Sequence, residues 1–103
     1  YKMRIYHNGK AGEIKISNIV FDGISYNLII KEMKVGSIYA YNENATIKFT
    51  DRLGPILFIE NGAKIPIKKC QELIDYIWSN ADKLERFTPL YSYTTEYKIN
   101  YLD

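Results

Sequence analysis

Residues 19–30 read IVFDGISYNLII, so the pair Asp22-Gly23 separates two apolar runs. An Asp-Gly pair between alternating apolar residues is the strongest short-range signal for a β-hairpin with a two-residue turn. With these two residues at the turn, Phe21 pairs with Ile24, and the apolar side chains of both strands share one face. The stretch therefore predicts antiparallel strands that bury one side.

The strand before this hairpin contains a change of phase. Apolar residues occupy even positions up to Ile16 and odd positions from Ile19. Side chains of a regular strand alternate between two faces, so apolar residues that share one face move from even to odd positions only where the strand is irregular. We therefore expect a β-bulge near Ser17-Asn18. Further upstream, Met3–His7 alternates as a short strand, and Asn8-Gly9 supplies the loop after it.

A second hairpin is predicted within residues 38–49. Ile38–Tyr41 and Thr46–Phe49 alternate apolar and polar residues, and residues 42–45 separate them. A two-residue turn at Glu43-Asn44 sorts the side chains of this hairpin onto two faces. The core face would carry Ile38, Ala40, Ile47 and Phe49, and the outer face would carry Tyr39, Tyr41, Thr46 and Lys48.

A third hairpin is predicted around Asn61-Gly62, which joins two further apolar runs. The register of this hairpin pairs Phe58 with Ile65. Pro66 lacks a backbone N–H, so we expect its strand at an edge of the sheet or directly before a helix.

The period of the apolar residues changes from about Lys68 to Phe87. Apolar residues there recur at spacings of three and four, which is typical of one buried face of an amphipathic helix. That face carries Cys70, Leu73, Ile74, Ile77, Trp78, Ala81 and Leu84. We expect one long helix near residues 68–87 that covers the apolar side of the sheet and ends at Thr88-Pro89.

The chain ends in a run with tyrosines at odd positions. These positions hold Tyr91, Tyr93, Tyr97 and Tyr101. Because strand side chains alternate, we expect a C-terminal strand with one aromatic face. That face serves either as core beneath the helix or as an open binding surface.

Together these elements predict an α+β fold. We expect a meandering antiparallel sheet of about six or seven strands, with several hairpins, packed against one long amphipathic helix near residues 68–87 and followed by the C-terminal strand. Hairpin connections favour antiparallel neighbours, because parallel strands need longer crossover connections. With 103 residues and no linker or repeat, residues 1–103 are expected to form a single domain.

Composition and charge exclude several classes of protein. Hydrophobic residues make up 47% of the chain and charged residues 25%, which is a globular composition, and no apolar run approaches the roughly 18 residues of a membrane span. The net charge of +2 is too small for an obligate duplex-DNA binder. Cys70 is the only cysteine, so no internal disulfide can form. We expect a soluble, cytoplasmic protein that does not contact a membrane.

The sequence contains no catalytic, metal-binding or cofactor-binding pattern. His7 and Cys70 are the only candidates for a base and its nucleophile, and Cys70 falls on the apolar helix face. No paired spacing of cysteine and histidine completes a zinc site around His7. The glycines are scattered at turns, and none forms a phosphate-binding loop. We therefore expect no enzymatic activity, no metal and no cofactor.

Two groups of residues remain as candidates for binding. The first is the outer face of the second hairpin, where Tyr39, Tyr41 and Lys48 lie beside a turn that contains Glu43. Tyrosine is favoured at contact sites because it combines a large area, a polar tip and a small loss of side-chain entropy. The second group is basic and consists of Lys64, Lys68 and Lys69. The alternative is that the tyrosines form a small second core and that the lysines only make the surface polar.

Two functions fit these residues. The first is a small non-enzymatic protein-binding module, such as a phage or mobile-element inhibitor or accessory protein of the anti-defence or anti-CRISPR type. The small size and the AT-rich codons of the abundant Ile, Lys, Asn and Tyr favour it. The alternative is a single-stranded nucleic-acid-binding protein, in which sheet tyrosines stack on bases and lysines contact phosphates. The identity of the partner and the oligomeric state do not follow from the sequence.

Overall fold

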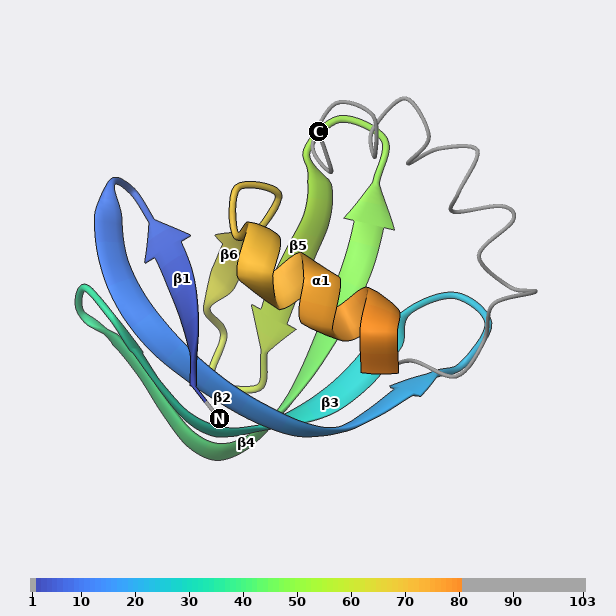
Figure 1. Cartoon of the computed structure of the whole chain (residues 1–103), viewed down its shortest axis with the longest axis horizontal. Coiled ribbons are helices and arrows are strands. Elements are labelled where there is room, and N and C mark those ends of the chain that lie inside the picture. Colours follow the sequence, from blue (N-terminus) through green and yellow to red (C-terminus); the bar gives the residue numbers. More distant parts are fainter. Residues whose placement is uncertain (1, 81–103) are drawn as a thin grey trace.

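The structure, a computed structural model, describes residues 2–80 and contains a six-stranded antiparallel sheet (Figure 1). Each strand pairs with the next one along the chain, so the strand order is β1-β2-β3-β4-β5-β6. The strands are β1 (Met3–His7), β2 (Lys10–Phe21), β3 (Tyr26–Val35), β4 (Ile38–Thr50), β5 (Gly54–Ile59) and β6 (Lys64–Pro66). The predicted antiparallel meander is confirmed, because every neighbouring pair runs antiparallel.

The sheet curls around the described helix, α1 (Gln71–Asn80), and forms a half-barrel (Figure 1). The helix lies on the concave side, where its Leu73, Ile74 and Ile77 are buried. Inward side chains from all six strands complete the core, including Met3, Ile5, Ile14, Tyr26, Ile30, Met33, Ile47, Leu57 and Ile65. The exposed strand side chains of the described residues therefore lie mainly on the convex face.

The predicted bulge in β2 is confirmed. The register between β2 and β3 shifts between Ser17 and Val20, and Asn18 has a φ of 56°. Asparagine adopts this left-handed backbone more readily than most residues. The turn at Asn8-Gly9 is also confirmed, and both of its residues have the positive φ that a two-residue hairpin turn of type I′ requires.

The loop between β2 and β3 contains four residues rather than two. Phe21 pairs with Tyr26, so the predicted pairing of Phe21 with Ile24 is wrong. The cause is the Asp22 carboxylate, whose Oδ1 accepts hydrogen bonds from the N–H groups of Ile24 and Ser25, both at 2.9 Å. This local turn around an aspartate side chain replaces the backbone pairing of a two-residue hairpin.

The Asp22 carboxylate should make the stability of this loop depend on pH. The N–H groups of Ser25 and Ile24, with the side-chain amide of Asn27, lower the pKa of Asp22 from 3.8 to about 2. Because the pKa of Asp22 is lower in the folded state than in the unfolded state, the stabilisation is present above the unfolded-state pKa and is lost as the pH falls from about 4 to about 2.

The variant Asp22→Asn keeps an acceptor oxygen but removes the titrating carboxylate. In urea denaturation, this variant should be less stable than the wild type at pH 7, and the difference should shrink toward pH 2. A difference that stays constant with pH would contradict the role of the charge.

Residues 38–50 form one continuous strand, so the predicted hairpin across residues 42–45 is wrong. The turn lies earlier, at Gly36-Ser37, where a glycine φ of 58° suits the first position of a two-residue hairpin turn. Residues 43–45 instead pair with β3, and Ala45 pairs with β5 as well. Pairing with neighbouring strands therefore outweighs the local preference of asparagine for a turn.

The hairpin of β5 and β6 forms where it was predicted, but its register differs by one residue. Phe58 pairs with Lys64 and Leu57 pairs with Ile65, so the predicted pair of Phe58 and Ile65 is wrong. The reason is the loop, which contains three residues and ends at Gly62 rather than having two residues. A shift of one residue moves side chains to the other face. Leu57 and Ile65 consequently enter the core.

The helix α1 begins at Gln71, three residues later than predicted. Ile67 still belongs to the sheet, because its N–H donates to the Pro55 carbonyl at 2.9 Å, and the Cys70 N–H then closes a turn on the Ile67 carbonyl at 2.8 Å. The described helix has ten residues, so the expected long helix is not borne out. The remainder of that prediction, residues 81–87, and the predicted C-terminal strand lie outside the described residues. In the described part of the chain, no helix has the length and apolar character needed to cross a membrane.

The start of α1 covers the free edge of β1. The Arg4 N–H donates to Glu72 Oε1 at 2.9 Å, and the Tyr6 N–H donates to Cys70 Sγ at 3.2 Å. Unpaired N–H groups on a strand edge are a template for pairing with other chains, so these two side chains also protect the edge. The other edge of the sheet is β6, which confirms the edge position predicted from Pro66.

We expect the Cys70 thiol to be unreactive in the native protein. Burial raises the pKa of this thiol, and the hydrogen bond from the Tyr6 N–H offsets part of the increase. Since the thiolate is the reactive species, a thiol reagent at pH 8 should label Cys70 only after unfolding in urea. The control is the same protein in urea, where labelling should be stoichiometric. Rapid labelling without urea would show that Cys70 is accessible and reactive.

Candidate functional site

The residues predicted to bind a partner occupy three separate places in the structure. Tyr39 and Tyr41 lie in the first half of β4, on the convex face. Lys48 and Lys64 lie beside Phe58, and Lys68 and Lys69 lie between β6 and α1.

The continuous β4 separates residues that the predicted hairpin would have joined. Lys48 follows Tyr41 by seven residues, which is about 20 Å along a strand at roughly 3.3 Å per residue. The structure therefore does not bring Lys48 together with the two tyrosines. Glu43 is half-buried and pairs with Ile30 inside the sheet, so it is not a turn residue.

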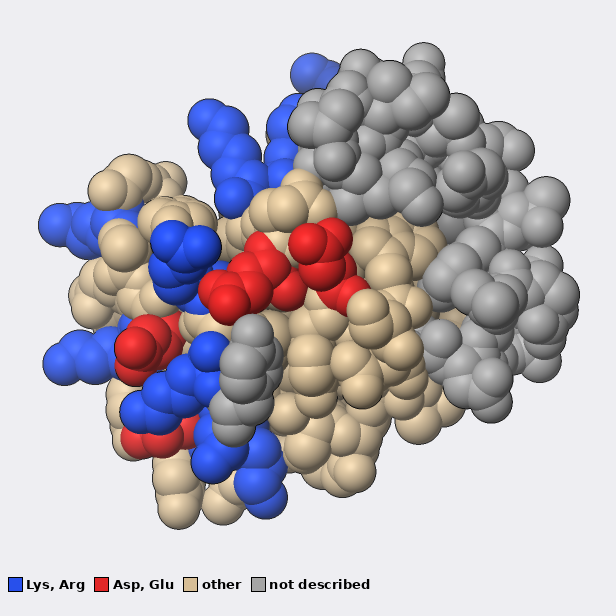
Figure 2. Space-filling view, viewed as in Figure 1, with Lys and Arg blue, Asp and Glu red and all other residues tan. Residues whose placement is uncertain are grey.

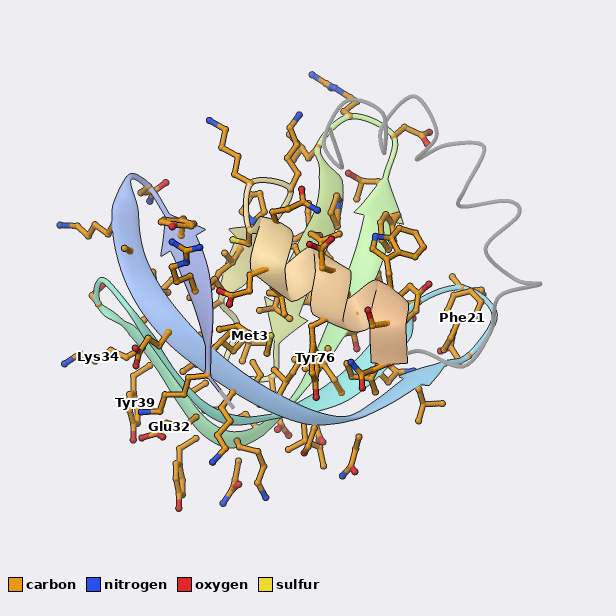
Figure 3. All side chains as sticks on the ribbon, viewed as in Figure 1. Met3, Phe21, Glu32, Lys34, Tyr39 and Tyr76 are labelled. Atoms are coloured by element: carbon orange, nitrogen blue, oxygen red, sulfur yellow. The ribbon has the colours of Figure 1, made fainter. Side chains whose placement is uncertain are left out.

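Tyr39 and Tyr41 are the most exposed aromatic side chains among the described residues, at 56% and 59%. Lys34 lies opposite Tyr39 and Glu32 lies opposite Tyr41 in the register of β3 and β4. In Figure 3 the labelled side chains of Glu32, Lys34 and Tyr39 lie near one another on the outer side of the curl. We call the outward side chains of Lys31, Glu32, Lys34, Tyr39, Tyr41 and Asn42 the tyrosine patch.

A bend shared by β3 and β4 enlarges the tyrosine patch. In β3 the buried residues Ile30 and Met33 are three positions apart, so Lys31 and Glu32 between them are both exposed. In β4 the matching irregularity is Asn42, whose φ is 51°. Each irregularity adds one outward side chain to its strand. The three-residue spacing of Ile30 and Met33 is the sequence signal that would have identified Lys31 and Glu32 as part of a surface.

Two hollows flank Glu32 within the tyrosine patch. The first has a volume of about 210 Å³, and its lining includes Lys2, Glu13, Glu32, Lys34 and Tyr39. The second has a volume of about 250 Å³ and is lined by Lys15, Lys31, Glu32, Tyr41 and Asn42. Hollows beside exposed tyrosines can accept protruding side chains of a partner, which a flat surface cannot.

The charges around the tyrosine patch alternate in sign. Across the strands, Glu13 lies opposite Lys34 and Lys15 lies opposite Glu32. Lys2 Nζ lies 3.7 Å from Glu13 Oε1, and both side chains are exposed. Figure 2 shows basic and acidic side chains interspersed at the lower left, over the first strands of the sheet. The tyrosine patch is therefore surrounded by charged side chains of both signs.

A second outward cluster consists of Phe58 and two lysines. The Nζ atoms of Lys48 and Lys64 lie 5.5 Å and 5.8 Å from the centroid of the Phe58 ring. Both distances are within the roughly 6 Å at which a cation is attracted to an aromatic ring. The structure thus brings together Lys48 and Lys64, which the sequence analysis assigned to different groups.

Lys68 and Lys69 form a third site with the end of β1. The residues on either side of them, Ile67 and Cys70, are buried, so the two lysines lie at the surface. Both lysines line a pocket of about 510 Å³ that also includes Tyr6. Lys64, which was predicted to share their surface, lies instead in the Phe58 cluster.

The described residues contain no cluster of side chains that could hold a metal ion. Within residues 2–80, no three side chains of His, Cys, Asp or Glu converge to hold a metal ion. His7 lies at the end of β1, where its Nε2 is 3.3 Å from Asn8 Nδ2. The described surface provides exposed aromatic side chains, charges of both signs and hollows.

Comparison with known proteins does not identify a family for this chain. Against protein-family models, curated proteins and solved structures, nothing matches this chain.

Proposed function

We propose that this chain is a small non-enzymatic protein-binding module that contacts its partner through the tyrosine patch. The observation that carries the proposal is the exposure of Tyr39 and Tyr41, each more than half exposed and each lining one of the two hollows beside Glu32. Tyrosines are enriched at the centres of protein interfaces, where they contribute a large share of the binding energy.

The backbone of both tyrosines is paired with β3, and that of Tyr39 is also held on its other side. β3 pairs with this part of β4 on one side, and Asn61 Nδ2 donates to the Tyr39 carbonyl at 3.1 Å on the other. A preorganised surface loses less conformational entropy on binding. The tyrosine patch therefore has the rigidity that a contact surface needs.

The alternation of charge favours a protein partner over a nucleic acid at this patch. A nucleic-acid backbone is uniformly negative, so it would be attracted by the lysines around the patch but repelled by Glu13 and Glu32 among them. A folded protein carries both signs and can place a cation beside Glu32 and an anion beside Lys34. Such complementary pairs set specificity and association rate more than affinity.

The biological role that we propose for this module is that of an inhibitor or accessory protein of a phage or mobile element, of the anti-defence or anti-CRISPR type, acting in the cytoplasm. The AT-rich residue usage of the chain supports this role. The buried Cys70 thiol, with its raised pKa, fits a structural part better than a nucleophilic one.

A double substitution of the tyrosines tests the proposal. Tyr39→Ala with Tyr41→Ala should retain the folded circular-dichroism spectrum and lose about 2 kcal/mol or more of binding free energy, as central aromatic anchors do. The matched control, Val20→Ala with Ile24→Ala, removes two exposed apolar side chains outside the patch and should bind normally. The measurement is capture of a nuclease-insensitive partner by the wild type, followed by titration of that partner with each variant.

Two outcomes would contradict the proposal. Equal affinity of the tyrosine variant and the control variant would place the contact surface elsewhere. Unfolding of the tyrosine variant would show that Tyr39 and Tyr41 stabilise the fold rather than contact a partner.

Single-stranded nucleic-acid binding is a second candidate function, and the Phe58 cluster favours it. Bases stack on aromatic rings while lysines contact phosphates, and Phe58 has Lys48 and Lys64 on the adjacent strands. The test is a titration of a fluorescent oligothymidine at low salt. Binding that is lost in Lys48→Gln with Lys64→Gln would support this candidate, and the absence of binding by the wild type would reject it.

A further inference from the structure

A pocket of about 510 Å³ lies where the end of β1, the loop between β4 and β5 and the turn before α1 meet. Its lining includes Tyr6, His7, Leu53, Pro66, Lys68 and Lys69. Sites for small molecules typically have volumes of roughly 300–1,000 Å³. No described residue of this pocket belongs to the tyrosine patch, so the pocket is an independent feature of the molecule.

The charged side chains described in the pocket lining are basic. Lys68 and Lys69 are adjacent in the chain, and neither takes part in an ion pair with another described residue. Because both lysines line the pocket, an anion bound there is attracted by two positive charges. His7 adds a ring that can donate a further hydrogen bond. The polar side of the pocket therefore suits an anionic group.

Apolar groups also line the pocket. Leu53 is 54% exposed in the loop between β4 and β5, and the Tyr6 ring and Pro66 also line the pocket. An exposed leucine beside an aromatic ring provides a wall for a flat apolar group. The volume and this wall together indicate an organic ligand rather than a bare inorganic anion.

Backbone hydrogen bonds fix each of the three walls. The Tyr6 N–H donates to Cys70 Sγ at 3.2 Å, which ties β1 to the turn before α1. The Ile67 N–H donates to the Pro55 carbonyl at 2.9 Å, and the Leu53 N–H donates to Thr50 Oγ1 at 3.0 Å. The pocket is therefore preformed, which lowers the entropic cost of ligand binding.

We propose that this pocket binds a small organic anion that carries a carboxylate or phosphate group on an aromatic ring. The anionic group lies between Lys68 and Lys69, with His7 as a further donor. The aromatic ring packs against Tyr6 and Leu53.

Titration of the full chain by ¹H–¹⁵N NMR tests this proposal with three probes: benzoate, phenyl phosphate and the neutral benzamide. Saturable shifts are expected for the amides of His7, Leu53, Lys68 and Lys69 with at least one of the two anions. Comparing benzoate with phenyl phosphate shows which anionic group the site prefers. Benzamide should bind at least about tenfold more weakly, because a hydrogen bond to a charged group contributes more than one to a neutral group.

Matched variants separate the pocket from a general effect of charge. Lys68→Gln with Lys69→Gln should weaken binding of the preferred anion at least about tenfold, because both ammonium donors are lost. Lys10→Gln removes a positive charge from an exposed residue outside the pocket lining and outside the tyrosine patch, and it should leave binding unchanged. Leu53→Ser should weaken binding of the preferred anion about threefold, because it removes part of the apolar wall. Equal binding of benzamide and the anions, or unchanged binding by the Lys68 and Lys69 variant, would overturn the proposal.

Discussion

Ile77→Ala is expected to lower the free energy of unfolding by about 2–5 kcal/mol, the largest loss that we anticipate for a single substitution in this chain. Ile77 is 1% exposed and projects from α1 into the core that the curled sheet encloses. Alanine at this position removes apolar surface from the core and leaves a cavity. The strands around the cavity are held by their hydrogen-bond ladders, so the cavity cannot fully collapse. Urea denaturation monitored by circular dichroism measures the effect.

The stability changes of other α1 variants serve as references for that of Ile77→Ala. Ile77→Val should cost about 0.5–1.5 kcal/mol, because it removes less of the side chain. Ser79→Ala should change stability by less than about 0.5 kcal/mol, because Ser79 is exposed. Trp78 is only half-buried, with its ring centroid 6.0 Å from that of Phe49, so Trp78→Ala should cost less than the roughly 3–5 kcal/mol of a fully buried tryptophan. An Ile77→Ala midpoint equal to that of the wild type would show that α1 does not belong to the core.

Gly12→Ala is expected to destabilise the sheet by about 1–3 kcal/mol or more, through steric overlap rather than through a cavity. A Cβ at this position of β2 would overlap the backbone carbonyl oxygen of Lys34 and lie 2.6 Å from Val35 Cα and 2.7 Å from Val35 Cβ. Most of these atoms belong to the backbone of β3, so a change of rotamer cannot relieve the overlap. The two strands would have to separate, which breaks part of their hydrogen-bond ladder. The denaturation midpoint and the exchange rates of the β2 and β3 amides measure this separation.

The neighbouring residue provides the control for Gly12→Ala. Ala11 is exposed on the same strand, so Ala11→Ser should change stability by less than about 0.5 kcal/mol. If Gly12→Ala is as stable as the wild type, then β2 and β3 do not approach each other as closely at this position as the structure shows.

The candidate site was only partly predictable from the sequence. The alternation of residues around Tyr39 and Tyr41 correctly placed both side chains on the outer face, because alternation depends only on the strand itself. The neighbours of the two tyrosines were not predicted, since Lys34 and Glu32 reach them from another strand through the register of β3 and β4. Lys48 was assigned to the wrong neighbours for the same reason, because the hairpin that would have brought it back does not form.

The pocket beside Lys68 and Lys69 was not predictable at all from the sequence. Its walls come from the end of β1, from Leu53 and from the turn before α1, which are far apart in the chain. They meet because the sheet curls and because Cys70 and Glu72 hold the edge of β1. A curl of this kind results from the twist and packing of the whole sheet, and no local pattern encodes it.

The sequence by itself determined the buried face of the helix and where several irregularities occur. The apolar face of α1 at Leu73, Ile74 and Ile77, the bulge at Asn18 and the turn at Asn8-Gly9 all follow from periodicity or from the backbone preferences of a few adjacent residues. The tertiary structure decided which strands pair and in what register. Asn42 favours a turn locally, yet it remains in a strand because β3 pairs with Tyr41 and Glu43 on either side of it and β5 pairs with β4 from Ala45 onward. Hydrogen bonds to neighbouring strands and burial of the concave face outweigh a local preference, and both depend on residues distant in the chain.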